Sequence, residues 1–311
     1  MRYDDFRRSD DIEDRRDEGG GMGGGGGIGL PMGGGGLGIG TIIVLGLIGY
    51  AFGIDPRILI GGAEILTGGG QAPTYQTDRR ASQGKSGAPT DEMGSMISGI
   101  LGEIDDRWSE VFRASGQTYT GPKIVLFRNA TNGGRCGMAQ SAMGPFYCPP
   151  DQKIYLDTGF FREVETRFRG CSGNACKFTA AYIIAHEAGH HVQNLLGIIP
   201  RVTRLQQQAG SKADANALQV RVELQADCLS GVWTNREEKK RPGFLEAGDI
   251  DAALTTASAI GDDTLQRQAT GRVVPDSFTH GSAAQRKEWF MRGYKEGNIN
   301  ACNTFAPGAV R

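Results

Sequence analysis

Apolar residues recur every three or four positions along much of the chain from residue 91 onward, and this spacing predicts amphipathic helices. One face of the first expected helix carries Met93, Ile97, Ile100, Ile104, Trp108 and Val111. Further helices are expected over 158–168, 175–196, 202–238, 250–260 and 283–294. Two short segments fit strands instead, KIVLF at 123–127 and QKIYLD at 152–157. Residues 91–311 are therefore predicted to form one α+β domain, mainly helical with a small sheet.

The first ninety residues lack this pattern. Residues 1–18 mix Arg with Asp and Glu, and 19–40 are nearly all glycine, so we predict a disordered cytoplasmic tail over 1–36. Residues 37–54 hold no charge over 18 positions, about the minimum for a transmembrane helix. A buried core helix and a cleaved signal peptide are the alternatives. Residues 55–90, rich in Gly, Gln, Ser and Pro toward the end, read as a flexible linker.

Arginines flank the apolar run unequally. Five of them precede it, and only Arg57 follows it closely. Because positive residues stay on the cytoplasmic side, the N-terminus should be cytoplasmic and residues 91–311 should lie beyond the membrane. The lipid bilayer is then one partner of the chain. The net charge of −1 and the lack of a basic stripe with interleaved aromatics argue against a nucleic-acid partner.

Six cysteines suit disulfides in an exported domain. The most economical pairing is Cys136 with Cys148, Cys171 with Cys176, and Cys228 with Cys302. A four-cysteine zinc site is the rival interpretation, but the chain contains no C-x-x-C motif.

Three of the four histidines lie in one segment, AYIIAHEAGHHVQNLLG at 181–197. On a helix, His186 and His190 project from the same face, where two imidazoles can bind one zinc ion. Glu187 lies close enough to act as general base toward a zinc-activated water, which is the chemistry of the H-E-x-x-H motif. His191 points about 100° away from His190 and is expected to be structural.

A catalytic zinc site needs a third protein ligand and one open position. The metzincin pattern is excluded, because Gln193 and Leu196 stand where that class has glycine and histidine. His280 is one candidate for the third ligand. Glu223 in VELQADCLSG is the better one, since it lies on a strongly helical, partly apolar segment. Asp227, one turn on, could accept the second N–H of a ligating histidine.

HEAGH at 186–190, ELQAD at 223–227 and FTHGSAAQR at 278–286 occur in an order that resembles the bacterial neutral zinc metallopeptidase family, membrane-anchored proteins of the gluzincin kind. The segments 136–157 and 302–305 also resemble it, so the likeness covers roughly 108–305. The three motifs are similar as well to those of CaaX-prenyl and heat-shock membrane endopeptidases, where proline stands at the position of Gly281. The resemblance implies a zincin-like fold, with His186, His190 and Glu223 as ligands and Glu187 as catalytic base.

These observations predict a membrane-anchored zinc endopeptidase with one catalytic Zn²⁺ and peptide or protein substrates. The expected location is the bacterial inner membrane, with a single crossing and a periplasmic domain. His280 is expected to donate a hydrogen bond to the tetrahedral intermediate, and Arg286 to hold a nearby carboxylate or the substrate. Strand 152–157 is expected to be the sheet edge that pairs with an extended substrate. The alternatives are a catalytically silent, zinc-stabilised scaffold and a cytoplasmic or lipid-associated enzyme with reduced cysteines.

Overall fold

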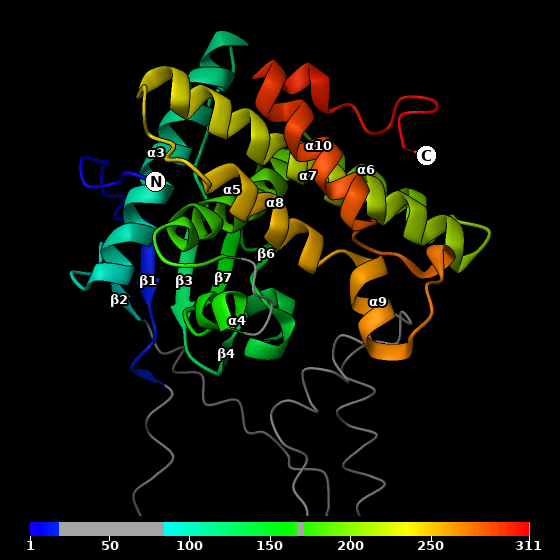
Figure 1. Cartoon of the computed structure of the whole chain (residues 1–311), viewed down its shortest axis with the longest axis horizontal. Coiled ribbons are helices and arrows are strands. Elements are labelled where there is room, and N and C mark those ends of the chain that lie inside the picture. The colour runs from blue at the N-terminus through cyan, green and yellow to red at the C-terminus, as the bar shows by residue number, and fades with distance from the viewer. Residues whose placement is uncertain (19–83, 167–170, 311) are drawn as a thin grey trace, which may run out of the picture.

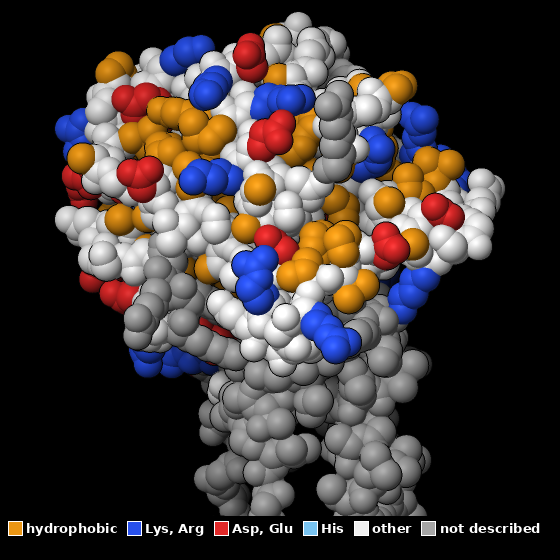
Figure 2. All heavy atoms as spheres, turned by 45° about the vertical axis from the view of Figure 1, so that its right-hand side comes forward, with side chains coloured by type: hydrophobic (Ala, Val, Ile, Leu, Met, Phe, Trp, Pro, Cys, Tyr) orange, Lys and Arg blue, Asp and Glu red, His pale blue; other side chains and the backbone are white. Residues whose placement is uncertain are grey.

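The computed structural model describes residues 1–18, 84–166 and 171–310. A small sheet lies beside a larger group of helices (Figure 1). On the face drawn in Figure 2, basic and acidic side chains are interspersed among several apolar clusters. Within the described ranges, no helix combines the length and apolar character needed to cross a membrane. The predicted transmembrane helix at 37–54 lies outside these ranges.

The main sheet has five strands in the order β2-β1-β3-β7-β6. β1 (Ile12–Asp14), β3 (Lys123–Phe127) and β7 (Lys153–Asp157) are parallel, whereas β2 (Lys85–Ser86) and β6 (Phe146–Cys148) run antiparallel to their neighbours. The strands expected at 123–127 and 152–157 are therefore present. β7 has partners on both sides and cannot take up a substrate strand, so that prediction is wrong. The sheet edge on this side is β6.

A second sheet pairs β4 (Ala130–Asn132) with β5 (Met138–Gln140). Short 3-10 turns follow at η2 (Gly134–Cys136), η3 (Ser141–Met143), η4 (Pro275–Ser277) and η5 (Ile299–Cys302). The helices are α3 (Glu92–Ala114), α4 (Phe160–Thr166), α5 (Ala175–Leu195), α6 (Ile198–Gln207), α7 (Lys212–Lys240), α8 (Asp249–Ala259), α9 (Asp262–Thr270) and α10 (Ala283–Glu296). The helix expected over 202–238 is thus two helices, because Ser211 caps a new start by accepting from the Asp214 N–H.

Helix α7 is central to the packing. It runs against both α5 and α10, and Figure 1 shows α10 lying along it. Two glycines permit the close α7–α10 contact, since a Cβ on Gly231 would clash with the carbonyl of Phe290 and one on Gly293 with that of Cys228. The disulfide between Cys228 and Cys302 ties α7 to η5.

All three predicted disulfides are present, and no cysteine in the described ranges is free. The bond between Cys136 and Cys148 joins η2 to β6, and the bond between Cys171 and Cys176 closes the turn before α5. The four-cysteine zinc site is therefore ruled out.

Residues 1–18 belong to the folded domain, so the prediction that this part of the tail is disordered is wrong. Phe6 and Ile12 are buried in the main core, and β1 lies inside the sheet. The backbone of Arg7 passes over Gly102 of α3, where any side chain would clash with it, and the Arg7 N–H donates to Glu103. The charges that suggested disorder are paired across the fold, as in Arg16 with Asp91. The linker prediction also fails at its end, because β2 occupies 85–86.

Strand pairing restricts how this chain can meet a membrane. Glu13 is opposite Ser86, and Asp14 is opposite Lys85, so both ends of the segment between 18 and 84 lie at one edge of the sheet. A single crossing at 37–54 would leave β1 and its partner strands on opposite sides of the bilayer. The predicted topology, with the N-terminus cytoplasmic and the domain periplasmic, is inconsistent with this sheet in one chain.

Candidate metal centre

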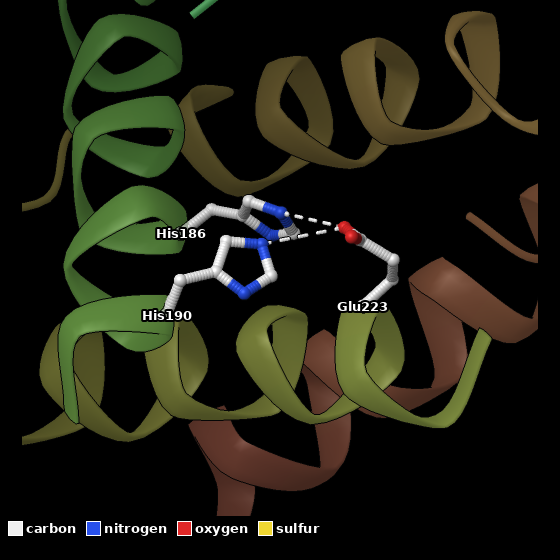
Figure 3. Close-up of side chains that lie close together, drawn as sticks. All are labelled: His186, His190 and Glu223. Atoms are coloured by element: carbon white, nitrogen blue, oxygen red, sulfur yellow. Dashed lines mark hydrogen bonds and ion pairs between the residues drawn. The ribbon is translucent and has the colours of Figure 1, made fainter. Parts of the chain in front are cut away.

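The H-E-x-x-H segment lies in the middle of α5, which is almost entirely buried there. One helical turn separates His186 from His190, so both rings project toward α7 (Figure 3). Their planes are nearly perpendicular, with ring centroids 4.8 Å apart. The sequence expectation that these two imidazoles share a helix face is met.

Helix α7 brings Glu223 to the same point. Its Oε2 atom lies 3.3 Å from Nε2 of His186 and 3.4 Å from Nε2 of His190. The helices can come this close because residue 189 is glycine: a Cβ there would lie 3.1 Å from the carbonyl oxygen of Ala226. One donor atom each from His186, His190 and Glu223 lie within 4.8 Å of one another.

The donor atoms suit a zinc ion. Nδ1 of His186 lies 2.9 Å from Oδ1 of Asp227, and Nδ1 of His190 lies 2.9 Å from Oε1 of Gln193. Each Nδ1 therefore donates its proton to an oxygen, which leaves both Nε2 lone pairs free on the side of Glu223. Two imidazoles and one carboxylate are a ligand set found in catalytic zinc sites.

Asp227 is fully buried and accepts from several donors. Besides His186, the hydroxyl of Tyr182 donates at 2.7 Å, and Arg286 donates from Nε at 2.9 Å and from Nη2 at 3.0 Å. Burial alone would raise the pKa of Asp227, but the charges and hydrogen bonds of Arg286 and His186 together outweigh burial and hold that pKa below its usual range. Arg286 thus holds a carboxylate, one of the two roles expected from the sequence.

The electrostatics of these side chains match a cation site. Burial lowers the pKa of His186, but the carboxylates around it, Asp227 first and then Glu223 and Glu187, together outweigh burial and raise this pKa to about 10. Burial likewise lowers the pKa of His190, and Glu223 raises it, so that this pKa lies above its ordinary value. The pKa of Glu223 is held well below its ordinary value, against burial, by His190 and His186. The carboxylates attract positive charge, whether a proton or a metal ion supplies it.

Glu187 is also buried and adjoins this group. Burial raises its pKa, while the nearby charges of His186 and His190 and a hydrogen bond from the backbone N–H of Tyr147 oppose that rise. Tyr147 belongs to edge strand β6, so the edge of the sheet faces this carboxylate.

His280 lies near the site without belonging to the group of three. Its Nδ1 lies 3.3 Å from Oδ1 of Asp262, and its side chain is 30% exposed. Burial lowers its pKa, but Asp262 and then Glu223 raise it above the ordinary value. Asp262 also accepts from the backbone N–H groups of Thr279, His280 and Gly281, and so fixes this loop. Asp262 could not be singled out from the sequence, because an aspartate in the first turn of a helix reads only as a helix start.

His191 is fully buried and plays a structural part, as expected from its direction on the helix. Its Nε2 donates to the carbonyl of Thr120 at 2.6 Å, and its Nδ1 accepts from the hydroxyl of Tyr147 at 2.9 Å. Burial lowers the pKa of His191, which keeps it neutral in this role. This histidine therefore holds β6 beside α5.

Comparison with known proteins also points to a zinc site. The family described as "Putative neutral zinc metallopeptidase" matches residues 1–305. The chain belongs to this family. The match includes the N-terminal residues that form β1, which agrees with their place in the folded domain.

Two relatives carry no assigned activity. "Uncharacterized protein YpfJ" of Escherichia coli strain K12 is 46% identical over 306 residues, covering 98% of this chain and 99% of its own. An uncharacterized protein of Mycobacterium tuberculosis strain H37Rv is 47% identical over 196 residues, covering 60% of this chain and 64% of its own. No solved structure matches the chain. The family therefore implies a zinc-binding peptidase, and the roles of individual residues have to be argued from the geometry of the site.

Proposed function

We propose that this member of the metallopeptidase family is a zinc-dependent endopeptidase. The observation that carries the proposal is the convergence of His186, His190 and Glu223 beside the buried carboxylate of Glu187. The two histidines and Glu223 would hold the ion. Zinc bound there would supply Lewis acidity, which lowers the pKa of water and polarises a peptide carbonyl.

Glu187 is the proposed general base. Burial raises the pKa of Glu187 toward neutral pH, and this makes its carboxylate a better proton acceptor. It would accept a proton from the attacking water and deliver it to the leaving amine. A zinc site with a purely structural role has no use for this base, which argues against the scaffold alternative.

Substrate is proposed to bind as an extended chain along β6. This strand is the sheet edge that contacts α5, and its Tyr147 N–H reaches the proposed base. An added strand makes backbone hydrogen bonds, which suits recognition of peptides with varied side chains. His280, oriented by Asp262, is proposed to donate a hydrogen bond to the developing oxyanion.

The compartment is proposed from the cysteines. Three disulfides favour an oxidising location such as the periplasm. Because β1 pairs with β2 and β3, residues 1–18 would share that location.

The test uses the full chain, because a fragment starting at residue 91 would lack β1 and β2. Zinc content and cleavage of casein are measured for the wild type, Glu223→Ala, Glu187→Gln and the control Glu237→Gln, which changes a buried glutamate elsewhere on α7. We expect one zinc per chain in the wild type and its loss in Glu223→Ala. Glu187→Gln should keep zinc and lose cleavage by about 100-fold or more. Zinc-loaded wild type that cleaves no protein would favour the scaffold, and wild type without zinc would refute the proposal.

A further inference from the structure

A buried glutamine supports one of the candidate zinc ligands. Gln193 is fully buried one turn after His190, and its Oε1 accepts from Nδ1 of that histidine. Its Nε2 donates to the carbonyl of Val222 at 2.8 Å and to Oε1 of Gln225 at 3.0 Å. Every polar atom of this side chain is therefore in use.

The direction of these hydrogen bonds is fixed from the far end. Gln225 donates from Nε2 to the carbonyl of Cys302 at 2.8 Å, and a backbone carbonyl can only accept. Gln225 must then turn its Oε1 toward Gln193, which has to offer its own Nε2. The carbonyl of Val222 makes the same demand on Gln193 independently. Only Oε1 of Gln193 remains for His190, so Nδ1 of the ring carries the proton.

A second series of hydrogen-bonded glutamine side chains reaches Glu223 in the same manner. Nε2 of Gln219 donates to Oε1 of Glu223 at 2.9 Å, while its own Oε1 accepts from Gln206 at 3.1 Å. Gln206 also faces a backbone carbonyl, that of Ala215, at 3.3 Å. With Oε1 of Glu223 occupied, Oε2 is the oxygen that faces the two histidines.

We propose that Gln193 and Gln219 are positioning residues of the zinc site, a role that rests on the function proposed above. Gln193 selects the tautomer of His190 that leaves Nε2 free for the ion. Gln219 holds Glu223 so that a single oxygen is presented. Both series of hydrogen bonds end on backbone carbonyls, so the two ligands are oriented without adding any charge to the site.

Zinc affinity tests this role without reference to catalysis. Full-length wild type, Gln193→Met and Gln219→Met are titrated with zinc against a competing chelator, because methionine keeps the side-chain length and removes the hydrogen bonds. The matched control is Gln266→Met, since Gln266 is buried and bonded to Ser277 and Val274, away from the ligands. We expect zinc affinity to fall about 10–100-fold in the two test variants and less than about 2-fold in the control. Gln219 is only partly buried, so that variant keeps the test open if Gln193→Met does not fold.

A structural readout accompanies the titration. In zinc-loaded wild type, the imidazole N–H signal of His190 should belong to Nδ1 and exchange slowly with water, whereas Gln193→Met should lose that protection. Test variants that bind zinc as tightly as the wild type, or a control that weakens as much as they do, would overturn the proposal. Wild type that binds no zinc would instead refute the proposed function, so the two failures are distinguishable.

Discussion

Helix α7 carries buried carboxylates at two places, and they differ sharply. Glu223 and Asp227 lie at its middle, where the candidate zinc site is built. Glu237 lies near its C-terminal end, about 15 Å from Asp227 along the axis. All three side chains are buried, and all three face basic groups.

The difference lies in how completely each carboxylate is bonded. Asp227 accepts well-formed hydrogen bonds from His186, Tyr182 and Arg286, and its pKa is lowered. Glu237 has Arg241 at 3.1 Å and Arg107 at 3.6 Å, but neither of its oxygens accepts a hydrogen bond of good geometry. Burial, reinforced by Glu103, raises the pKa of Glu237 to about 7.

This contrast shows that burial and nearby charge do not by themselves indicate a functional site. At the middle of α7, donors hold each carboxylate in its ionised form, ready for a cation. At the end of α7, the charges have a different task, because Arg241 bonds Asp5 and Glu103, and Glu103 also accepts from Arg7. The second cluster therefore secures the N-terminal residues to the domain.

The largest expected effect is the side of the membrane on which residues 1–18 lie, and its outcome is all-or-none. If the second cluster holds residues 1–18, they must lie on the same side of the membrane as the zinc site. Asp10→Cys and Lys295→Cys place single exposed thiols in the N-terminal segment and in α10. In spheroplasts of cells expressing the full chain, a membrane-impermeant maleimide should label both variants or neither before lysis. Labelling of Lys295→Cys alone would restore the single-crossing topology and contradict the sheet.

The next largest effect should come from breaking the well-bonded cluster. Asp227→Ala leaves Arg286 buried without its partner, which should lower the free energy of unfolding by about 3–5 kcal/mol. Glu237→Gln, its counterpart in the loosely bonded cluster, should cost less than about 1 kcal/mol at neutral pH, because the charge it removes is already disfavoured. Urea denaturation of the metal-free proteins measures both values. If both variants lost the same free energy of unfolding, the difference in hydrogen bonding between the clusters would not contribute to stability.

The cluster at the middle of α7 could be predicted from the sequence, whereas the cluster around Glu237 could not. The positions of His186, His190, Glu223 and Asp227 follow from helical periodicity on two helices. Gln193 was also within reach, since it stands three residues after His190 on the same helix, a spacing that brings side chains together. In the sequence, however, Gln193 was informative only as a residue that excludes the metzincin pattern.

The parts that the sequence did not predict depend on contacts between distant residues. Ile12 enters the sheet only because β3 lies beside it, more than a hundred residues later. A local window therefore sees the charges around Ile12 and predicts disorder. The choice of β6 as the sheet edge likewise depends on strand order, which the alternation within residues 152–157 cannot reveal.

The smallest predicted effect is a pH dependence that separates the two clusters. Glu237 has a pKa of about 7 in the folded chain and an ordinary value of 4.5, so between these values the folded state binds more protons than the unfolded state. Its contribution to stability is fully present below about pH 4.5 and is lost as the pH rises through 7. Glu237→Gln does not titrate, so its unfolding free energy should gain on the wild type from pH 5 to 7.5, by at most about 1.4 kcal/mol per pH unit. A difference that stays constant over this range would show that Glu237 is ionised throughout, and the two carboxylate clusters of α7 would then be alike.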